Sequence, residues 1–521
     1  MAQVRLVSGI LTVGAWTMLS RLFGFARDIA FAATMGAGPV AEAFLIALSL
    51  PNLFRRFFAE GAFNLAFVPM FARKLEGGED AADFAADALT GLALVVSLVM
   101  ALAMLFMPWL VWAMASGFQG DARFAMAVDF GRITFPYILL ISLTALLSGI
   151  LNATGRFVAA AVAPVLLNIC LLGATGLALW FHWPVGPALA WSVPIAGAAQ
   201  LALVWQAAAQ AGYRILPRRP RLTPDLRRLA RVAAPAMLAG GVSQINLLVG
   251  RQVASFYDGA VAWLSYADRL YQLPLGVVGV AIAVVLLPDL ARRLRAGDGP
   301  GGQASLNRAA EFALALTLPA TVALMVIATP LVQVLFQRGA FSAGDTAHTA
   351  LSVLIYAAGL PALVLHKVLQ PLFYAREDSV RPFRYALVCL GVNAGLALAL
   401  VPWLGFLSAP VGMTVAAWAM LALLWFGSRS MGEETALDRR FRARMPGMLL
   451  AAAAMGLVLW LLAAALAGPL SNPHWRYGAL ALLVSLGSAT YFGIGALLGA
   501  FRLVEFKTLL RKANRPEPPP T

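Results

Sequence analysis

Long apolar segments alternate with short polar ones along the whole chain, and this pattern predicts a polytopic membrane protein. About 20 apolar residues cross the hydrocarbon core as a helix, and about fourteen segments reach that length. They are far longer than a barrel strand, so the predicted fold class is an all-α membrane protein. We place the segments at roughly 8–33, 41–71, 89–115, 127–153, 158–181, 184–209, 228–256, 261–290, 309–336, 347–374, 383–401, 406–428, 446–468 and 475–500.

Basic residues collect in alternate loops between these segments. Arg73 and Lys74 follow the second segment, Arg292 and Arg293 follow the eighth, and further arginines fill the linker at 210–227. The intervening loops are short and carry few charges. Because cytoplasmic loops are enriched in Lys and Arg, both termini are predicted to be cytoplasmic. The same rule explains the net charge of +15, because the basic residues lie in loops on one side of the membrane. We therefore do not expect nucleic acid as a partner.

An internal repeat divides the chain into two lobes. Pro108 and Gly117 recur 222 residues later as Pro330 and Gly339, and the Arg73–Lys74 pair recurs after 219 residues. Six helices per half give both halves the same orientation, which is typical of transporters with a substrate site between parallel repeats. The predicted domains are an N-lobe (1–219), a C-lobe (220–440), two extra helices (441–502) and a cytoplasmic tail (503–521).

Composition supports a membrane protein and gives no sign of an enzyme. Hydrophobic residues make up 61% of the chain and charged residues 12%, about half the charged fraction of a soluble domain. No nucleophile elbow, metal-binding motif or P-loop is present. Cys170 and Cys389 lie alone in apolar segments, so we expect no cofactor, no assigned metal site and no catalytic residue.

The stretch PNLFRRFFAEGAF at 51–63 places charge inside an apolar segment. Each arginine at mid-bilayer costs at least about 2.5–3.5 kcal/mol, so two lipid-facing arginines would not persist there. Arg56 and Glu60 are four residues apart and can pair, whereas Arg55 has no acid at helical spacing. Two interpretations remain open: a helix that lines a cavity, or a helix end whose arginines reach the lipid headgroups.

Two further segments carry buried-type charges. The first contains SRLFGFARD, in which Arg21 and Asp28 share a helix face and Arg27 lies about 120° around from Arg21. The eighth contains Asp268 and Arg269. More arginines than acids in a cavity lined by these segments would indicate an anionic substrate, and the planar guanidinium suits phosphate oxygens. The alternative is an Arg27–Asp28 structural pair.

Four other polar residues in apolar segments are weaker candidates. Arg132, Arg251 and Lys367 could contact substrate, but each could instead lie near the membrane interface or pair locally. His366, beside Lys367, could relay protons, although a lone histidine is more often structural. These alternatives stay open at this point.

Several of these motifs resemble the MurJ (MviN) family, the bacterial lipid II flippases of the MOP exporter superfamily. The resemblance covers nearly the whole chain. It is carried by SRLFGFARD at 20–28, PNLFRRFFAEGAFNLAFVP at 51–69, ITFPYILLISLTALLSGILN at 133–152 and YADRL at 266–270.

The resemblance implies a fourteen-helix flippase of the bacterial inner membrane that serves peptidoglycan synthesis and cell shape. It implies a cationic cavity between the lobes and a groove for the undecaprenyl tail on the last two helices. Lipid II, membrane lipids and cell-wall or division proteins are the implied partners. Transport is expected to draw on the membrane potential or on Na⁺, H⁺ or Cl⁻.

The resemblance also assigns residues. The implied substrate arginines are Arg21, Arg27, Arg55 and Arg269, and Glu42 stands where the family has an acidic gate residue. Gln272 departs from a glutamate that some members use at the gate, which leaves at most a hydrogen bond there. The remaining implied supporting residues are Asp28, Asn52, Arg56, Glu60 and Asp268.

Three alternatives compete with a lipid II flippase. Another MOP-type exporter could move a drug or a different polyprenyl-linked glycan, but drug exporters usually have twelve spans and cationic cargo. A membrane glycosyltransferase would need acidic residues on a large outer loop, and the outer loops are short. A scaffold role would leave the arginines in apolar segments unexplained.

Overall fold

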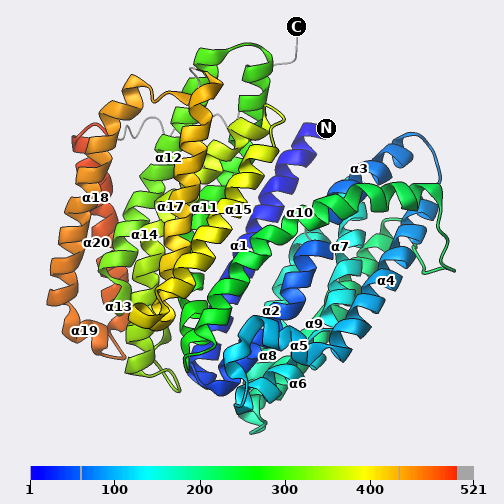
Figure 1. Cartoon of the computed structure of the whole chain (residues 1–521), viewed down its shortest axis with the longest axis horizontal. Helices are drawn as coiled ribbons and strands as arrows, with labels where there is room; N and C mark the ends of the chain where they lie inside the picture. The colour runs from blue at the N-terminus through cyan, green and yellow to red at the C-terminus, as the bar shows by residue number, and fades with distance from the viewer. Residues whose placement is uncertain (1, 59–61, 433–434, 501–521) are drawn as a thin grey trace. The chain divides into compact units, whose positions relative to one another are not determined.

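The computed structural model describes residues 2–58, 62–432 and 435–500, and within these ranges the chain is helical and has no strand (Figure 1). It forms two compact units. The first contains Met1–Ser265, Phe336–Asp345 and Val401–Ala409, and the second contains the rest. The all-α fold class predicted from the sequence is therefore confirmed.

The first unit holds the first ten α-helices of the described chain and the start of the eleventh, together with two later segments. Helix α1 packs lengthwise on α8, α8 packs on α9, and α10 packs against α2, α3, α4 and α5. The bounds are α1 (Ala2–Met35), α2 (Pro39–Phe58), α3 (Ala62–Glu76), α4 (Ala81–Leu105), α5 (Met107–Ala115), α6 (Ala122–Thr134), α7 (Tyr137–Ala153), α8 (Val158–Trp180), α9 (Val185–Gln210) and α10 (Pro224–Ala254).

The second unit begins within α11 and continues to the end of the described chain. Two short segments, around the α13–α14 loop and around α16, belong to the first unit instead. The bounds are α11 (Ala260–Arg295), α12 (Gly299–Val326), α13 (Ala328–Phe336), α14 (Ala343–Tyr374), α15 (Val380–Ala399), α16 (Val401–Leu404), α17 (Ser408–Ser428), α18 (Arg439–Ala465), α19 (Ala467–Ser471) and α20 (Arg476–Leu497).

Each predicted apolar segment coincides with one helix or with two consecutive helices. The segment predicted at 41–71, for example, is α2 followed by α3, and residues 59–61 between them lie outside the described ranges. Ten helices or helix pairs of the described chain are long and apolar enough to cross a membrane. The count of fourteen crossings stays a prediction.

The internal repeat is visible in the way helices end. Gly78 after α3 and Gly297 after α11 are 219 residues apart, and both have positive φ, 66° and 69°. The next residues, Glu79 and Asp298, each donate an N–H at 3.0 Å to the carbonyl five residues earlier. This is the Schellman pattern, which needs a left-handed residue and therefore favours glycine.

A second pair of helix ends repeats at a shift of 222. Gly155 after α7 has φ of 75°, and Glu377 after α14 has φ of 60°. Arg156 and Asp378 then close the same backbone bond to the carbonyl five residues earlier, at 2.8 and 3.0 Å. Matching caps at these two shifts agree with the repeat that the sequence predicts.

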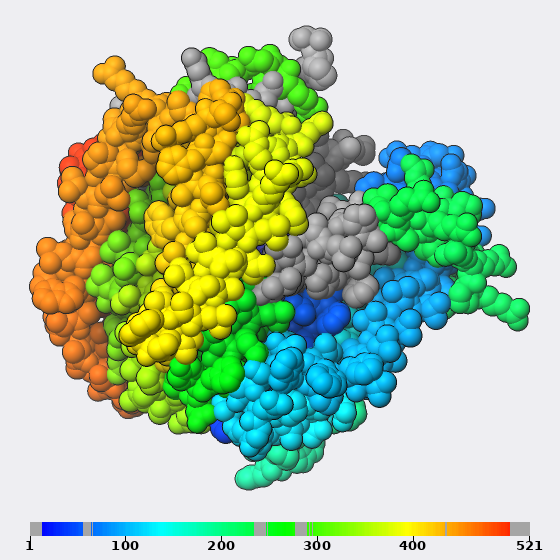
Figure 2. All heavy atoms as spheres, in the orientation of Figure 1, coloured from blue at the N-terminus to red at the C-terminus, as the bar shows by residue number. Residues whose placement is uncertain are grey.

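The last helices form their own apolar core within the second unit. Helix α18 packs against α12 and α20, and Met448, Leu459 and Leu483 are buried between them. Large apolar side chains of α18 such as Leu450 and Trp460 are exposed. Figure 2 shows the α18 segment, in orange, at the surface. Exposed leucine and tryptophan over several helical turns indicate a surface in contact with lipid.

Candidate functional site

Helix α1 carries a buried cation that is fully engaged. The Arg27 guanidinium donates from Nε and Nη2 to Asp28 Oδ1, at 3.0 and 2.7 Å. Its Nη1 donates to Asn168 Oδ1 at 2.8 Å, across the α1–α8 contact. Asn168 in turn donates from Nδ2 to the Ser20 carbonyl at 3.1 Å. The structure therefore contains the Arg27–Asp28 pair that the sequence left as an alternative to substrate contact.

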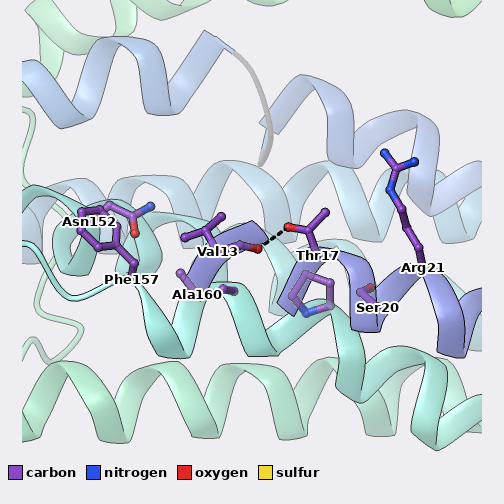
Figure 3. A pocket seen from close by; sticks show the side chains of 9 residues that line it. Val13, Thr17, Ser20, Arg21, Asn152, Phe157 and Ala160 are labelled. Atoms are coloured by element: carbon purple, nitrogen blue, oxygen red, sulfur yellow. Dashed lines mark hydrogen bonds between the residues drawn. The ribbon is translucent and has the colours of Figure 1, made fainter. Parts of the chain in front are cut away.

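Arg21 lies on the same helix in different surroundings. It is half-buried and makes no ion pair or hydrogen bond with the part of the chain that the structure describes. It lines a pocket of about 490 Å³ between α1 and α8, called here the α1–α8 pocket (Figure 3). The nine lining residues are Val13, Thr17, Ser20, Arg21, Asn152, Phe157, Ala160, Ala161 and Pro164.

The charged stretch of the second segment falls at the end of α2. Arg55 is half-buried there, and the Asn52 amide donates to the Leu48 carbonyl at 2.9 Å within its own helix. The Arg56 side chain and Glu60 lie outside the described residues, so their predicted pairing stays a prediction. Arg55 therefore lies near the end of a largely apolar helix. Both interpretations, a helix that lines a cavity and a helix end at the lipid headgroups, stay open.

Arg269 belongs to the second unit, on α11. Its side chain is exposed, and the neighbouring Asp268 is half-buried. Gln272 is exposed and donates from Nε2 to the Asp268 carboxylate one helical turn before it. This bond lies within α11, and a gate contact of Gln272 stays a prediction.

Glu42 is held in an ion cluster that we call the Arg123 cluster, formed by Glu42, Asp121, Arg123 and Asp258. Glu42 is only 1% exposed and accepts from Arg123 Nη1 at 2.9 Å and from the Val261 N–H at 3.1 Å. Arg123 also pairs with Asp258 at 2.8 Å and with Asp121. One guanidinium therefore joins α2, the start of α6 and the α10–α11 loop.

Asp121 is the N-cap of α6 and is the most local member of this cluster. Its side chain accepts the Arg123 N–H at 3.2 Å, as is common for an aspartate at a helix start. This backbone hydrogen bond, together with the Arg123 guanidinium, lowers the pKa of Asp121 below its usual value. The carboxylate is therefore ionised throughout the physiological range.

Close backbone contacts join the loop after α1 to the loop before α14 in the first unit. A Cβ on Gly36 would lie 2.4 Å from the Ala340 carbonyl oxygen, and one on Gly339 would lie 2.1 Å from that of Ala33. Both glycines also have positive φ, 58° and 56°. The Ala340 N–H donates to the Ala33 carbonyl at 2.9 Å. These loops pack so closely that only glycine fits at either position.

Side-chain hydrogen bonds reinforce the same end of the first unit. Trp263 Nε1 donates to Asp345 Oδ1 at 2.7 Å, and the Gly117 N–H donates to Ser255 Oγ at 3.0 Å. Trp263 and Asp345 both belong to the predicted C-lobe. Gly117 belongs to the predicted N-lobe, and its partner Ser255 belongs to the predicted C-lobe. These contacts lie at the end of the first unit that the sequence predicts to be periplasmic.

The weaker candidates do not join these groups. Arg132 is exposed and donates from Nε to the Met104 carbonyl at 3.4 Å. Arg251 is half-buried in the last turn of α10, and His366 and Lys367 are half-buried on α14. Within the described ranges, no group of three or more His, Cys, Asp or Glu side chains could hold a metal ion.

Sequence reasoning missed Arg123 and Asn168. Arg123 lies two residues after Asp121 in an outer loop with few charges. An arginine in such a loop was the one sequence signal that could have identified it as a functional candidate. Asn168 is the one amide in the apolar run of α8, and a buried amide needs partners. Neither signal identifies the partner, because Arg123 lies 81 residues from Glu42 and Asn168 lies 141 residues from Arg27.

Comparison with known families gives one consistent result. The model of the family described as "Lipid II flippase MurJ" matches residues 31–484. A "Probable lipid II flippase MurJ" of Rhizobium tropici is 43% identical over 99% of this chain and 98% of its own length. The protein of the same description from Rhizobium meliloti (strain 1021) is 45% identical over 96% of this chain and 95% of its own.

Solved structures show a similar fold. A structure described as "Lipid II flippase MurJ, inward closed conformation" has a TM-score of 0.78 at 23% identity and covers 94% of this chain and 98% of its own. An inward-facing MATE-family transporter of the MOP superfamily has a TM-score of 0.67 at 14% identity, over 81% and 98%. At these identities the likeness is one of fold alone.

Proposed function

The chain belongs to the MurJ family of lipid II flippases, and from this premise we propose that it moves lipid II across the bacterial inner membrane by alternating access. Lipid II is a disaccharide-pentapeptide joined to undecaprenol through a pyrophosphate. The cargo would pass from the cytoplasmic to the periplasmic leaflet. The observation that carries the proposal is Arg21, a cation without an ion pair in the described chain, on an apolar helix beside a pocket.

The pyrophosphate is the part of lipid II that such a cation suits. A guanidinium in surroundings of low polarity is costly unless an anion accompanies it, and phosphate oxygens match its planar fork. We assign Arg21, Arg55 and Arg269 to the pyrophosphate and headgroup. Arg27 has its own carboxylate, Asp28, so we assign it to supporting the α1–α8 contact and, through it, the site.

The Arg123 cluster serves as the periplasmic gate in this proposal. Its ion pairs join Arg123 to Glu42 and to Asp258, and in this proposal cargo enters from the cytoplasmic side while both pairs hold. Opening would separate Asp258 from Arg123, while Glu42, at 1% exposure, would keep the guanidinium on the first lobe. Rocking of the lobes would then expose the headgroup to the periplasm.

The undecaprenyl chain would stay on the membrane side, along α18 and α20. Their exposed apolar side chains support this assignment. Energy would come from the membrane potential or an ion gradient, as the sequence predicts. We propose no catalytic step.

Another MOP-type exporter is the second candidate, and the MATE-like fold favours it only at the level of architecture. A direct test is the accessibility of lipid II to an external enzyme that cleaves its pyrophosphate. Cells depleted of this protein should lose cleavage, wild type should restore it, and Arg55→Ala should fail. Normal cleavage after depletion, with no other flippase present, would refute lipid II as cargo.

A further inference from the structure

The α1–α8 pocket has an uneven distribution of polar groups. Figure 3 shows Asn152 and Phe157 at one end, Arg21 at the other, and Thr17 between them. Arg21 is the only charged residue among the nine that line it, and none of the nine is acidic. One end therefore suits an anion, and the rest suits a neutral polar group.

The neutral end still has hydrogen-bonding capacity. The exposed Asn152 amide makes no side-chain hydrogen bond with the described chain, so it can donate and accept. The Thr17 hydroxyl donates to the Val13 carbonyl at 2.7 Å and keeps its lone pairs as acceptors. Phe157 adds an apolar ring beside them. Hydroxyl and amide groups of a ligand would find partners here.

The dimensions fit a short, linear ligand fragment. Val13 and Arg21 are eight residues apart on α1, which is about 12 Å at ~1.5 Å per residue. Ala160 and Ala161 on α8 have small side chains, which leave the pocket its volume of about 490 Å³. Pockets of this size commonly hold a small ligand by a few placed polar groups.

We propose that this pocket is a subsite for a glycosyl pyrophosphate, in which Arg21 binds the phosphate and Asn152 and Thr17 bind the first sugar. The assignment rests on the proposed function and adds specificity to it. Arg21 selects any polyprenyl pyrophosphate, and Asn152 and Thr17 distinguish a lipid that carries a sugar from one that does not.

Binding of two lipids to the full-length protein in nanodiscs separates these roles. The lipids are lipid II and undecaprenyl pyrophosphate, which has no sugar. Arg21→Ala should weaken binding of both at least tenfold. Asn152→Ala, or Ala160→Leu, which narrows the pocket, should weaken lipid II by about tenfold and leave undecaprenyl pyrophosphate unchanged.

Thr175→Val is the matched control for Thr17→Val. Thr175 makes the same hydrogen bond to the carbonyl four residues earlier, but on α8 away from the pocket. Thr17→Val should weaken lipid II alone, and Thr175→Val should weaken neither lipid. Equal effects of Asn152→Ala and Ala160→Leu on both lipids, or no effect on either, would overturn the subsite and leave the flippase function standing. Failure of the wild type to bind lipid II would overturn the function itself.

Discussion

Arg123 and Arg21 both belong to the first unit, yet their side chains meet opposite surroundings. Arg123 is 5% exposed and holds three carboxylates, Glu42, Asp121 and Asp258. Arg21 is half-buried and has no carboxylate within bonding distance in the described chain. A cation on a largely apolar helix is stabilised by an anion, and the described residues supply none to Arg21.

Arg27 lies between these extremes on the same helix as Arg21. Its charge is balanced by Asp28 and its remaining hydrogens by Asn168. The comparison therefore separates two arginines with carboxylate partners from Arg21, which we propose binds the substrate. The predictions below alter either the contacts of the paired arginines and the loops of the first unit, or Arg21 itself.

The largest effect on stability is expected from Arg123→Ala. Removing this guanidinium leaves Glu42 buried without a cation, and breaking a buried ion pair typically costs about 3–5 kcal/mol. Thermal unfolding in detergent should show a large decrease in Tm. The double variant Arg123→Met with Glu42→Gln should recover much of it, because no buried charge then remains. An unchanged Tm for Arg123→Ala would show that the Arg123 cluster does not stabilise this end of the first unit.

Gly339→Ala should have the second-largest effect on stability. It should lower the free energy of unfolding by about 2–4 kcal/mol, because alanine is strained in a left-handed backbone and its Cβ is forced into a close contact. Its Cβ would meet the Ala33 carbonyl oxygen. Gly120→Ala is the matched control, because Gly120 also has positive φ (83°) but has open space around it. Unfolding measurements should therefore show a smaller loss for Gly120→Ala. Equal losses would mean that backbone conformation alone explains Gly339.

Asn168→Ala should cost about 1–3 kcal/mol, since Arg27 loses the acceptor of its Nη1 in a buried site. Asn168→Asp keeps an acceptor for Arg27 but removes the N–H donor to the Ser20 carbonyl. If Asn168 positions Arg27, the aspartate variant should recover transport more fully than the alanine variant. Transport assays that rank the two variants equally would contradict this role.

The smallest effect is a pH dependence of Asp121. Its folded pKa is lowered by the Arg123 N–H and guanidinium, so its stabilising effect is complete above the unfolded value of about 3.9 and is lost as pH falls through the folded pKa. Between pH 7 and 5 the wild type and Asp121→Asn should change in parallel. Below about pH 4 the wild type should lose stability more steeply, and parallel curves there would contradict the shift.

Much of the fold follows from periodicity and chain length. Apolar segments mark the helices, and the repeat found in Pro108 and Pro330 reappears in helix caps such as those at Gly78 and Gly297. Pro108 is the sequence signal for the division of α4 from α5, because proline has no N–H for a continuing helix and is favoured in a first turn. The apolar run alone, which continues through it, predicts one long segment.

The candidate site was only partly predictable for a physical reason. Arg21, Arg27 and Arg55 can be identified from the sequence because each is a charge inside an apolar segment. Inserting such a charge into the membrane costs free energy, so these residues usually have a functional role. Which of these arginines already has a partner depends on contacts between distant helices, as with Asn168 and Arg27. Helical spacing alone contains no information on those contacts.

The most direct test compares Arg21→Ala with wild type for both lipid II translocation in reconstituted vesicles and thermal unfolding. Arg21 has no described partner to lose, so the variant should unfold within a few degrees of wild type while translocation falls at least a hundredfold. Translocation at the wild-type rate would contradict the claim that Arg21 is held available for the anionic substrate. A collapse in stability would contradict the claim that it has no structural role.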